Sequence, residues 1–230
     1  MFYTIKTPWF FKKIIYPSLM WEKPTDEKVL YLTFDDGPHQ TATPFVLDQL
    51  KHYNAKATFF CIGKNVLQQQ NLYRRMLDEG HKAGNHTFNH LNGWKTNYKT
   101  YLNNILAAAK YIDSNLFRPP YGRITKLQAR LLQKAVDEKL INVNKKNNKE
   151  NSSSFTIHHS PFTIVMWTIL SGDFDEKISP ERCLQNVILY SKPGDIIVFH
   201  ESKKAWERMS FALPKVLEHF SKQGFSFRTL

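Results

Sequence analysis

Residues 31–38 have the sequence Tyr-Leu-Thr-Phe-Asp-Asp-Gly-Pro, and the interpretation of the whole 230-residue chain starts from them. The run from Val29 to Phe34 is apolar, β-branched and aromatic, which predicts a buried strand. The Gly-Pro pair that follows the two aspartates favours a turn. Ligand sites of α/β folds lie just past the carboxyl ends of strands, so Asp35 and Asp36 are candidate site residues. One can hold a metal while the other moves a proton, although this composition also suits an ordinary solvated turn.

Beyond this turn, segments with strand character alternate with segments of helical periodicity. The expected strands and short extended segments are 57–62, 83–87, 162–167, 196–199 and 225–230, and the expected helices are 44–53, 66–77, 101–112, 127–136, 180–190 and 205–221. This alternation predicts an α/β fold with a mainly parallel sheet closed into a barrel.

Polar side chains gather where the predicted strands stop. In a β/α barrel that edge is the catalytic face. The candidates are Asp35, Asp36, His86, His90, Arg118, Asp173 and His200.

His86 and His90 are spaced four residues apart. On a helical turn this spacing places both imidazoles on one face. Two histidines and a carboxylate form a ligand set for a divalent metal that keeps positions open for water and substrate. Alone, such a histidine pair more often has a structural role or lies on the surface. Together with Asp36, it favours a metal site.

Composition limits the functions to consider. The net charge of +12 invites a nucleic-acid interpretation, but the basic residues are scattered and form no arginine-rich arm, so we expect no nucleic-acid partner. An anionic polymer or a membrane surface remains open. Cys61 and Cys183 lie far apart in apolar contexts, which predicts buried free thiols.

Two segments depart from the regular pattern. Residues 1–28 form an expected N-terminal extension, in which residues 8–21 are aromatic and basic, suited either to a membrane interface or to packing on the domain. Lysines interrupt its apolar residues before any signal-peptide core forms, which predicts a cytoplasmic protein with possible peripheral membrane contact. The remaining domain, 29–230, contains a polar stretch at about 142–154 that we expect to be an exposed insertion.

Several motifs occur in the order seen in polysaccharide deacetylases, the NodB-homology or carbohydrate esterase family 4 enzymes, which this chain resembles from about Val29 to Leu230. They are Thr33 to Pro38, His86 to His90, Arg118 to Gly122, Trp167 to Asp173 and Phe199-His200. The resemblance implies a distorted (β/α) barrel and metal-dependent hydrolysis of an N-acetyl group on a glycan.

The resemblance also implies residue roles. Asp36, His86 and His90 are similar to the family's ligands of the metal, usually Zn²⁺, with Co²⁺ as an alternative. Asp35 resembles the general base, Arg118 its electrostatic partner, and His200 the general acid that Asp173 orients. The backbone N–H of Tyr121 is expected to stabilise the oxyanion.

The chain departs from the family pattern in one motif. Family members often carry Asp at the position of Leu170 and Trp at that of Phe174. Phe174 keeps an aromatic wall but loses an indole donor, which leaves substrate preference open. Glu201 stands where Asp commonly follows the histidine, a conservative difference.

The resulting hypothesis is a monomeric, metal-dependent N-deacetylase for an N-acetylglucosamine glycan of the peptidoglycan or chitooligosaccharide type. A deacylase acting on a non-glycan amide and a non-catalytic carbohydrate-binding barrel are its rivals. Trp94, Tyr98 and Trp206 are candidates either for a sugar groove or for core packing.

Overall fold

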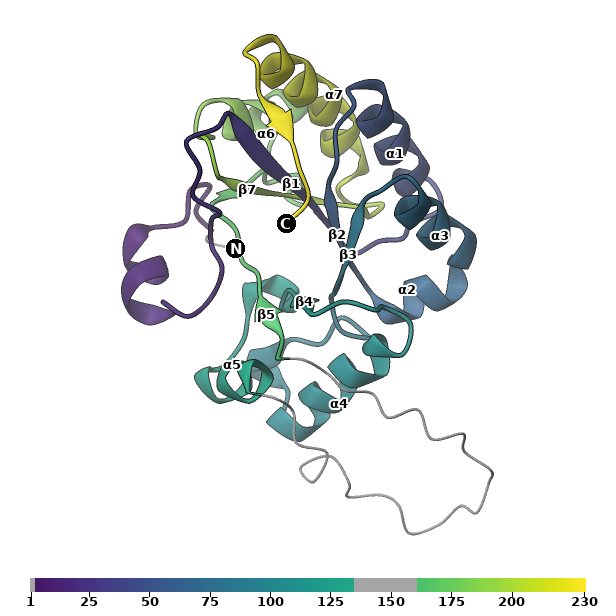
Figure 1. Ribbon diagram of the computed structural model, residues 1–230, viewed down its shortest axis with the longest axis vertical. Coiled ribbons are helices and arrows are strands. Elements are labelled where there is room, and N and C mark those ends of the chain that lie inside the picture. The colour runs from purple at the N-terminus through teal and green to yellow at the C-terminus, as the bar shows by residue number, and fades with distance from the viewer. Residues whose placement is uncertain (1–2, 135–160) are drawn as a thin grey trace.

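The computed structural model describes residues 3–134 and 161–230. Its centre is a parallel sheet with the strand order β5-β4-β3-β2-β1-β7-β6, and β8 pairs with the start of β1. Curved around a common axis, the strands form the distorted barrel that the sequence predicted (Figure 1). The strands are β1 (Val29–Asp35), β2 (Thr58–Cys61), β3 (Lys82–Asn85), β4 (Leu116–Phe117), β5 (Thr163–Ile164), β6 (Ile169–Leu170), β7 (Ile196–His200) and β8 (Ser226–Phe227).

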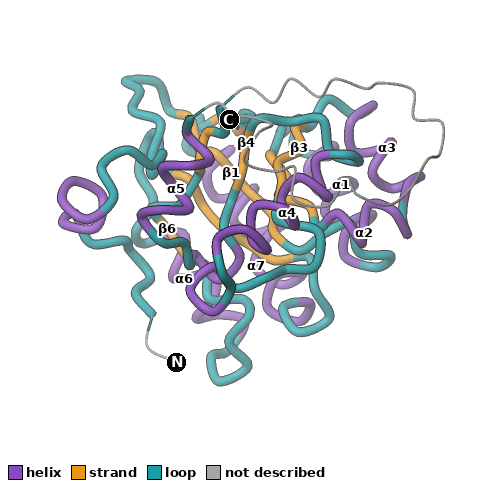
Figure 2. Tube along the Cα trace, turned by 90° about the horizontal axis from the view of Figure 1, so that it is seen from below, coloured by secondary structure: helices purple, strands orange, loops and turns teal. Residues whose placement is uncertain are grey.

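Helices surround the strands on the outside, as the view turned by 90° also shows (Figure 2). The α-helices are α1 (Ala42–His52), α2 (Gly63–Gln68), α3 (Gln70–Asp78), α4 (Tyr98–Ala109), α5 (Lys126–Gln133), α6 (Pro180–Ile188) and α7 (Trp206–Lys222). Three shorter elements are the π-helical turn η1 (Phe11–Ile15) and the 3₁₀ turns η2 (Gly93–Lys95) and η3 (Pro120–Gly122). Among the described residues, no helix combines the length and apolar character needed to cross a bilayer.

The strand β1 is buried along its whole length, and its alternation positions the site. Successive side chains of a strand point to opposite faces. Leu30, Leu32 and Phe34 join the large core between the sheet and the outer helices. Val29 and Tyr31 belong instead to a smaller cluster with residues of β2 and β7. The same period puts the side chain of Asp35 on the barrel's inner face, at the end of the strand.

The N-terminal segment lies along the seam between β5 and β6. Lys6 pairs with Ile169 in an antiparallel bridge, and Met20 pairs with Val165 in a parallel one. The Thr7 N–H donates to the Thr168 carbonyl at 2.9 Å. These contacts hold both ends of the segment, near Lys6 and near Met20, against the body of the barrel.

The predicted strand 162–167 is wrong in its extent, because β5 covers only Thr163–Ile164 and a separate β6 precedes the Ser-Gly-Asp turn. Arg118 supplies the physical reason. Its Nε donates to the Val165 carbonyl at 3.3 Å and its Nη2 to the Met166 carbonyl at 2.9 Å. These carbonyls therefore accept hydrogen bonds from a buried guanidinium and not from the backbone N–H groups of a neighbouring strand.

Other boundaries differ less. The helix predicted over 66–77 is two helices, since Gln69 adopts φ −125° and ψ 47° between α2 and α3. The last strand, predicted over 225–230, is confined to β8. Cys61 and Cys183 are buried free thiols, as predicted. The polar stretch at 142–154 and the end of the helix predicted over 127–136 lie outside the described residues.

Candidate active site

The turn after β1 sends its two carboxylates in different directions. Asp36 adopts φ +76°, a left-handed conformation that is uncommon for a residue with a side chain. The Asn65 amide donates to the Asp36 carbonyl at 2.7 Å and holds the turn. A Cβ on Gly37 would lie 1.9 Å from Oε2 of the buried Glu201, so a larger residue there would have to displace that side chain. Asp35 consequently faces Arg118, while Asp36 faces the histidines.

Asp35 and Arg118 form a buried ion pair inside the barrel. The Arg118 Nη1 donates to Asp35 Oδ1 at 2.8 Å and to the Thr33 hydroxyl at 2.7 Å. The guanidinium also lies over the Phe60 ring, 4.1 Å from its centroid. Burial lowers the pKa of Arg118, but nearby Asp35 opposes this effect. With all its nitrogens bonded, Arg118 fixes the orientation of the Asp35 carboxylate.

Asp36, His86 and His90 come together as a group that could hold a metal ion. Their candidate ligand atoms all lie within 4.8 Å of one another. Asp36 Oδ1 is 3.6 Å from His86 Nε2 and 3.2 Å from His90 Nε2. Within the described chain, this buried oxygen makes no hydrogen bond of good geometry. An unsatisfied carboxylate oxygen facing two imidazole nitrogens is the donor set that a divalent cation completes, so the residues fit a metal.

The outer nitrogens of both imidazoles are also occupied. The His86 Nδ1–H donates to the Arg118 carbonyl at 2.8 Å, and His90 Nδ1 lies 3.1 Å from the Tyr121 hydroxyl. Such partners orient a metal-binding histidine and leave its Nε2 free. Burial lowers the pKa of His86 to about 4, which keeps the ring neutral at pH 7. Burial opposes ionisation of Asp36, but the close approach of His90 Nε2 and the charges of His200 and His86 hold the pKa of that carboxyl well below its usual range.

The histidines do not lie on a helical turn, and that prediction is wrong. They flank a loop in which Thr87 has φ +64° and His90 has φ +56°. The Asn104 side chain on α4 accepts hydrogen bonds from the backbone N–H groups of Phe88 and Asn89, at 2.9 and 3.0 Å. These bonds hold the loop in place. Nothing in the sequence indicated this role for Asn104. It lies in the interior of a helix that was predicted only from its apolar residues.

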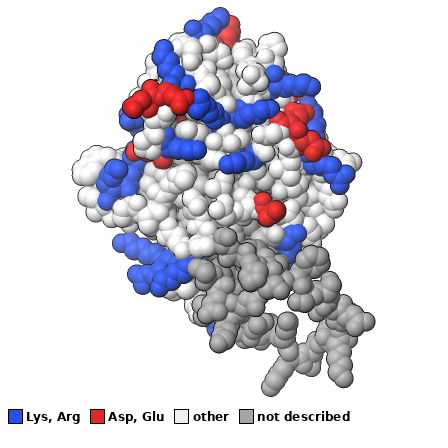
Figure 3. Space-filling view, viewed as in Figure 1, with Lys and Arg blue, Asp and Glu red and all other residues white. Residues whose placement is uncertain are grey.

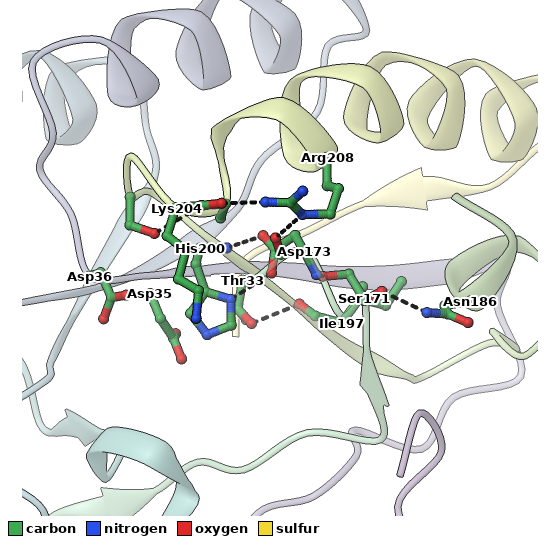
Figure 4. A network of polar contacts seen from close by, with 12 residues as sticks. Thr33, Asp35, Asp36, Ser171, Asp173, Asn186, Ile197, His200, Lys204 and Arg208 are labelled. Atoms are coloured by element: carbon green, nitrogen blue, oxygen red, sulfur yellow. Dashed lines mark hydrogen bonds and ion pairs between the residues drawn. The ribbon is translucent and has the colours of Figure 1, made fainter. Parts of the chain in front are cut away.

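His200 and Asp173 form the second charged pair of the site. The His200 Nδ1–H donates to Asp173 Oδ1 at 2.7 Å, and the His200 backbone N–H donates to Oδ2 at 2.6 Å. Arg208 Nε donates to the Asp173 carbonyl at 2.7 Å. Figure 4 shows the imidazole between Asp173 and the side of the site occupied by Asp35 and Asp36. Burial alone would lower the pKa of His200, but the charge and hydrogen bond of Asp173, with the two other aspartates, raise it to about 9.

The rim of the site is aromatic. Tyr121 is 53% exposed and adopts φ +62°, a strained conformation within η3. The Phe174 ring stands edge-on to His200, with centroids 5.4 Å apart, while Leu170 is buried. Trp94 is 61% exposed, and its Nε1–H donates to the Ile124 carbonyl at 3.0 Å, which holds the ring at the surface.

The other two aromatic candidates divide between surface and core. Tyr98, at the start of α4, is exposed. Trp206, at the start of α7, packs edge-on against Phe45 and joins the periphery of the large core.

The parallel barrel carries carboxylates and histidines at one edge of its sheet. A ligand set suited to a metal lies there beside two buried charge pairs. This arrangement is typical of β/α-barrel hydrolases. The chain belongs to the polysaccharide deacetylase family, whose model matches residues 22–136. A peptidoglycan-N-acetylglucosamine deacetylase of Bacillus cereus is 33% identical over 217 residues, covering 91% of this chain and 90% of the relative. A chitooligosaccharide deacetylase of a Bradyrhizobium species is 29% identical, covering 79% of this chain and 74% of the relative.

The fold is similar to that of solved deacetylases. The crystal structure of the Bc1960 peptidoglycan N-acetylglucosamine deacetylase, in complex with 4-naphthalen-1-yl-N-oxidanyl-benzamide, matches with a TM-score of 0.78 and 29% identity. The match covers 97% of this chain and 95% of that one. The extent of the overlap supports the distorted (β/α) barrel for the described residues.

Proposed function

We propose that this protein is a metal-dependent N-deacetylase that hydrolyses the acetamido group of N-acetylglucosamine units in a glycan of the peptidoglycan or chitooligosaccharide type. One observation carries the proposal: adjacent aspartates on one turn have separate partners, Asp35 with Arg118 and Asp36 with the two histidines. Metal-dependent amide hydrolysis needs both a metal ligand and a separate proton acceptor, and this turn supplies one of each. The activities of the named relatives agree with that chemistry.

Asp36, His86 and His90 would hold the metal, most suitably Zn²⁺ with Co²⁺ as a substitute, which polarises the amide carbonyl and lowers the pKa of water when bound. Asp35 accepts the proton of the attacking water. Arg118 keeps the carboxylate turned toward the site, because its Nη1 is itself anchored by Thr33. Because the two aspartates have different roles, their substitution should affect metal binding and turnover differently.

His200 acts at the other end of the reaction, on the leaving amine. An amine leaves as a neutral molecule only if it receives a proton, and a histidine with a raised pKa holds that proton at neutral pH. Asp173 fixes the Nδ1 side of the ring, which leaves Nε2–H to donate. The Tyr121 N–H is the proposed oxyanion donor. Loss of one such donor typically costs on the order of 10²–10³ in rate.

A substrate panel tests the proposal. The metal-reconstituted protein should release acetate from N-acetylglucosamine oligomers or peptidoglycan, with a matching gain of free amino groups. Asp35→Asn should abolish release, whereas His52→Ala, which changes an exposed histidine on α1, should retain it. Release from N-acetylated amino acids alone would favour a non-glycan amidohydrolase. Sugar binding without any acetate release would favour a non-catalytic barrel.

A further inference from the structure

The turn η1 and the two residues before it expose a group of apolar side chains that the proposed chemistry does not use. Trp9 is 66% and Ile14 is 64% exposed, and Phe10 and Phe11 beside them are also exposed. None of the residues of η1 is buried. In Figure 1 this turn projects from the side of the barrel, away from the sheet. Exposed apolar side chains are usually scattered over a protein surface, so four large ones side by side indicate an interaction site.

A basic helix face lies next to this turn. Lys126, Arg130 and Lys134 follow one another at intervals of four along α5 and its end, so they share a face, and all three are exposed. In Figure 3 the Lys and Arg side chains over α5 form a cluster with no acidic group within it. Segment 3–21 also contains no Asp or Glu.

A groove of about 510 Å³ joins the two features. Ile14, Ile15 and Tyr16 line one side, while Lys126, Arg130 and Lys134 lie on the other. Lys12 is already paired with Glu22, which leaves Lys13 and the α5 residues as the cations that face outward. The groove therefore offers cations to a phosphate group directly beside side chains that can enter a hydrocarbon layer.

We propose that residues 9–14 and the Lys126–Arg130–Lys134 face form a membrane-docking surface for an anionic phospholipid bilayer. Tryptophan and phenylalanine with neighbouring lysines are the side chains that settle at a bilayer interface, the rings at the depth of the headgroups and the cations among the phosphates. A glycan or a soluble polyanion would use only one half of this surface. A bilayer uses both halves at once, and the net charge of +12 favours its approach.

Co-sedimentation with lipid vesicles tests the proposal directly. The full chain should bind vesicles that contain phosphatidylglycerol, bind phosphatidylcholine vesicles much more weakly, and dissociate as salt is raised. The triple variant Lys126→Gln, Arg130→Gln, Lys134→Gln should lose about fivefold in partitioning per residue, on the order of a hundredfold in all. Trp9→Ser with Ile14→Ser should lose binding even at low salt. Equal binding by wild type and both variants would overturn the proposal.

Matched controls separate docking from general effects. Leu189→Ser removes an apolar side chain that is 65% exposed, close to the exposure of Ile14, just after the C-terminal end of α6. Lys51→Gln with Lys215→Gln and Lys222→Gln removes three exposed cations from α1 and α7. Both control variants should bind vesicles like the wild type. All variants should keep their melting temperature, which shows that lost binding is not lost folding.

Fluorescence shows which side chain inserts. Anionic vesicles should shift the tryptophan emission to shorter wavelength, and Trp9→Phe should abolish most of that shift while the protein still binds. Binding to soluble polyphosphate with no binding to either vesicle would contradict the proposal and assign the cations to a polyanion. Equal binding to neutral and anionic vesicles would also contradict it, because the basic face would then contribute nothing.

Discussion

Asp173→Asn is the most informative single substitution, because the structure specifies both what is lost and what is kept. Asp173 is fully buried and accepts two hydrogen bonds from His200, one from the ring and one from the backbone. An asparagine of almost equal size has one acceptor oxygen and turns an N–H₂ toward the second donor. The variant therefore removes the charge and one of the two hydrogen bonds, without opening a cavity.

The magnitude follows from the pKa of His200. Its value of about 9 lies well above the ordinary histidine value of about 6.5, which corresponds to about 3 kcal/mol in favour of the imidazolium. Asp173 is the largest of the groups that raise this pKa, so its loss should lower the value by about one to two units. At pH 8 the protonated fraction then falls from about 0.9 to between about 0.5 and 0.1, a two- to tenfold loss, whereas at pH 6 it hardly changes.

The assay is the pH–rate profile of deacetylation for wild type and Asp173→Asn. The alkaline limb, where the proposed general acid His200 loses its proton, should move to lower pH by that amount, and turnover should also fall at pH 6 because the ring is less well oriented. A cation held by Asp36 would lower the limb in both proteins, so the difference between them is the predicted quantity. His200→Ala should remove the limb and cost about 10²–10⁴ in rate.

A double-mutant cycle guards against an indirect effect. In the His200→Ala background, Asp173→Asn should cause little further loss, since its only proposed role is exerted through the ring. An unchanged alkaline limb in Asp173→Asn, or full additivity in the double variant, would refute the reasoning and leave Asp173 as a residue that merely stabilises its turn.

Three further predictions concern the metal site, acid stability and the tight turn at Gly122. Asp35→Asn should keep bound metal and lose turnover, whereas Asp36→Asn should lose both, as calorimetric metal titration beside acetate release would show; equal metal loss in the two variants would reverse the roles. Burial lowers the pKa of His81 to about 4, so the unfolded chain binds the extra proton first as pH falls, and stability should decline between about pH 6.5 and pH 4. The lost free energy of unfolding is about 3 kcal/mol. In chemical denaturation, the unfolding free energy of His81→Gln should depend less on pH in that window than that of the wild type. Gly122 has φ +65° and a Cβ there would lie 2.5 Å from the Trp167 ring, so Gly122→Ala should lower stability by about 1–3 kcal/mol, and an unchanged melting temperature would contradict the overpacking.

The barrel could be predicted because its central strands are apolar runs that alternate with helical segments. β1 is buried on both faces, so its residues form a continuous apolar run, and its end at the aspartates is marked by Gly37 and Pro38. The period of β1 alone decides that Asp35 points inward. Strand ends therefore indicate the candidate site residues from sequence alone, and the fold brings these residues together at one edge.

The rest depends on backbone conformations and contacts that no local pattern encodes. Asp36, Thr87, His90 and Tyr121 all adopt positive φ without being glycine, so composition gave no warning of the loop that replaced the expected helical turn. That loop is held by a side chain on α4, which only the tertiary structure brings near.

The strand predicted over 162–167 failed for a related reason. The carbonyls of Val165 and Met166 bond to Arg118, 47 and 48 residues earlier in the chain. The segment has the side chains of a strand, but a buried guanidinium takes its acceptors. Strand propensity is outweighed where a long-range polar side chain takes the backbone carbonyls as hydrogen-bond acceptors.

The proposed chemistry depends above all on Asp36, His86 and His90 holding one catalytic metal ion, and titration of metal-free protein with Zn²⁺ is the decisive test. Acetate release from an N-acetylglucosamine oligomer should rise in proportion to added metal and level off at one equivalent per chain, and His86→Ala should stay inactive throughout the titration while remaining folded. Full activity in protein shown by elemental analysis to contain no metal would contradict this assignment.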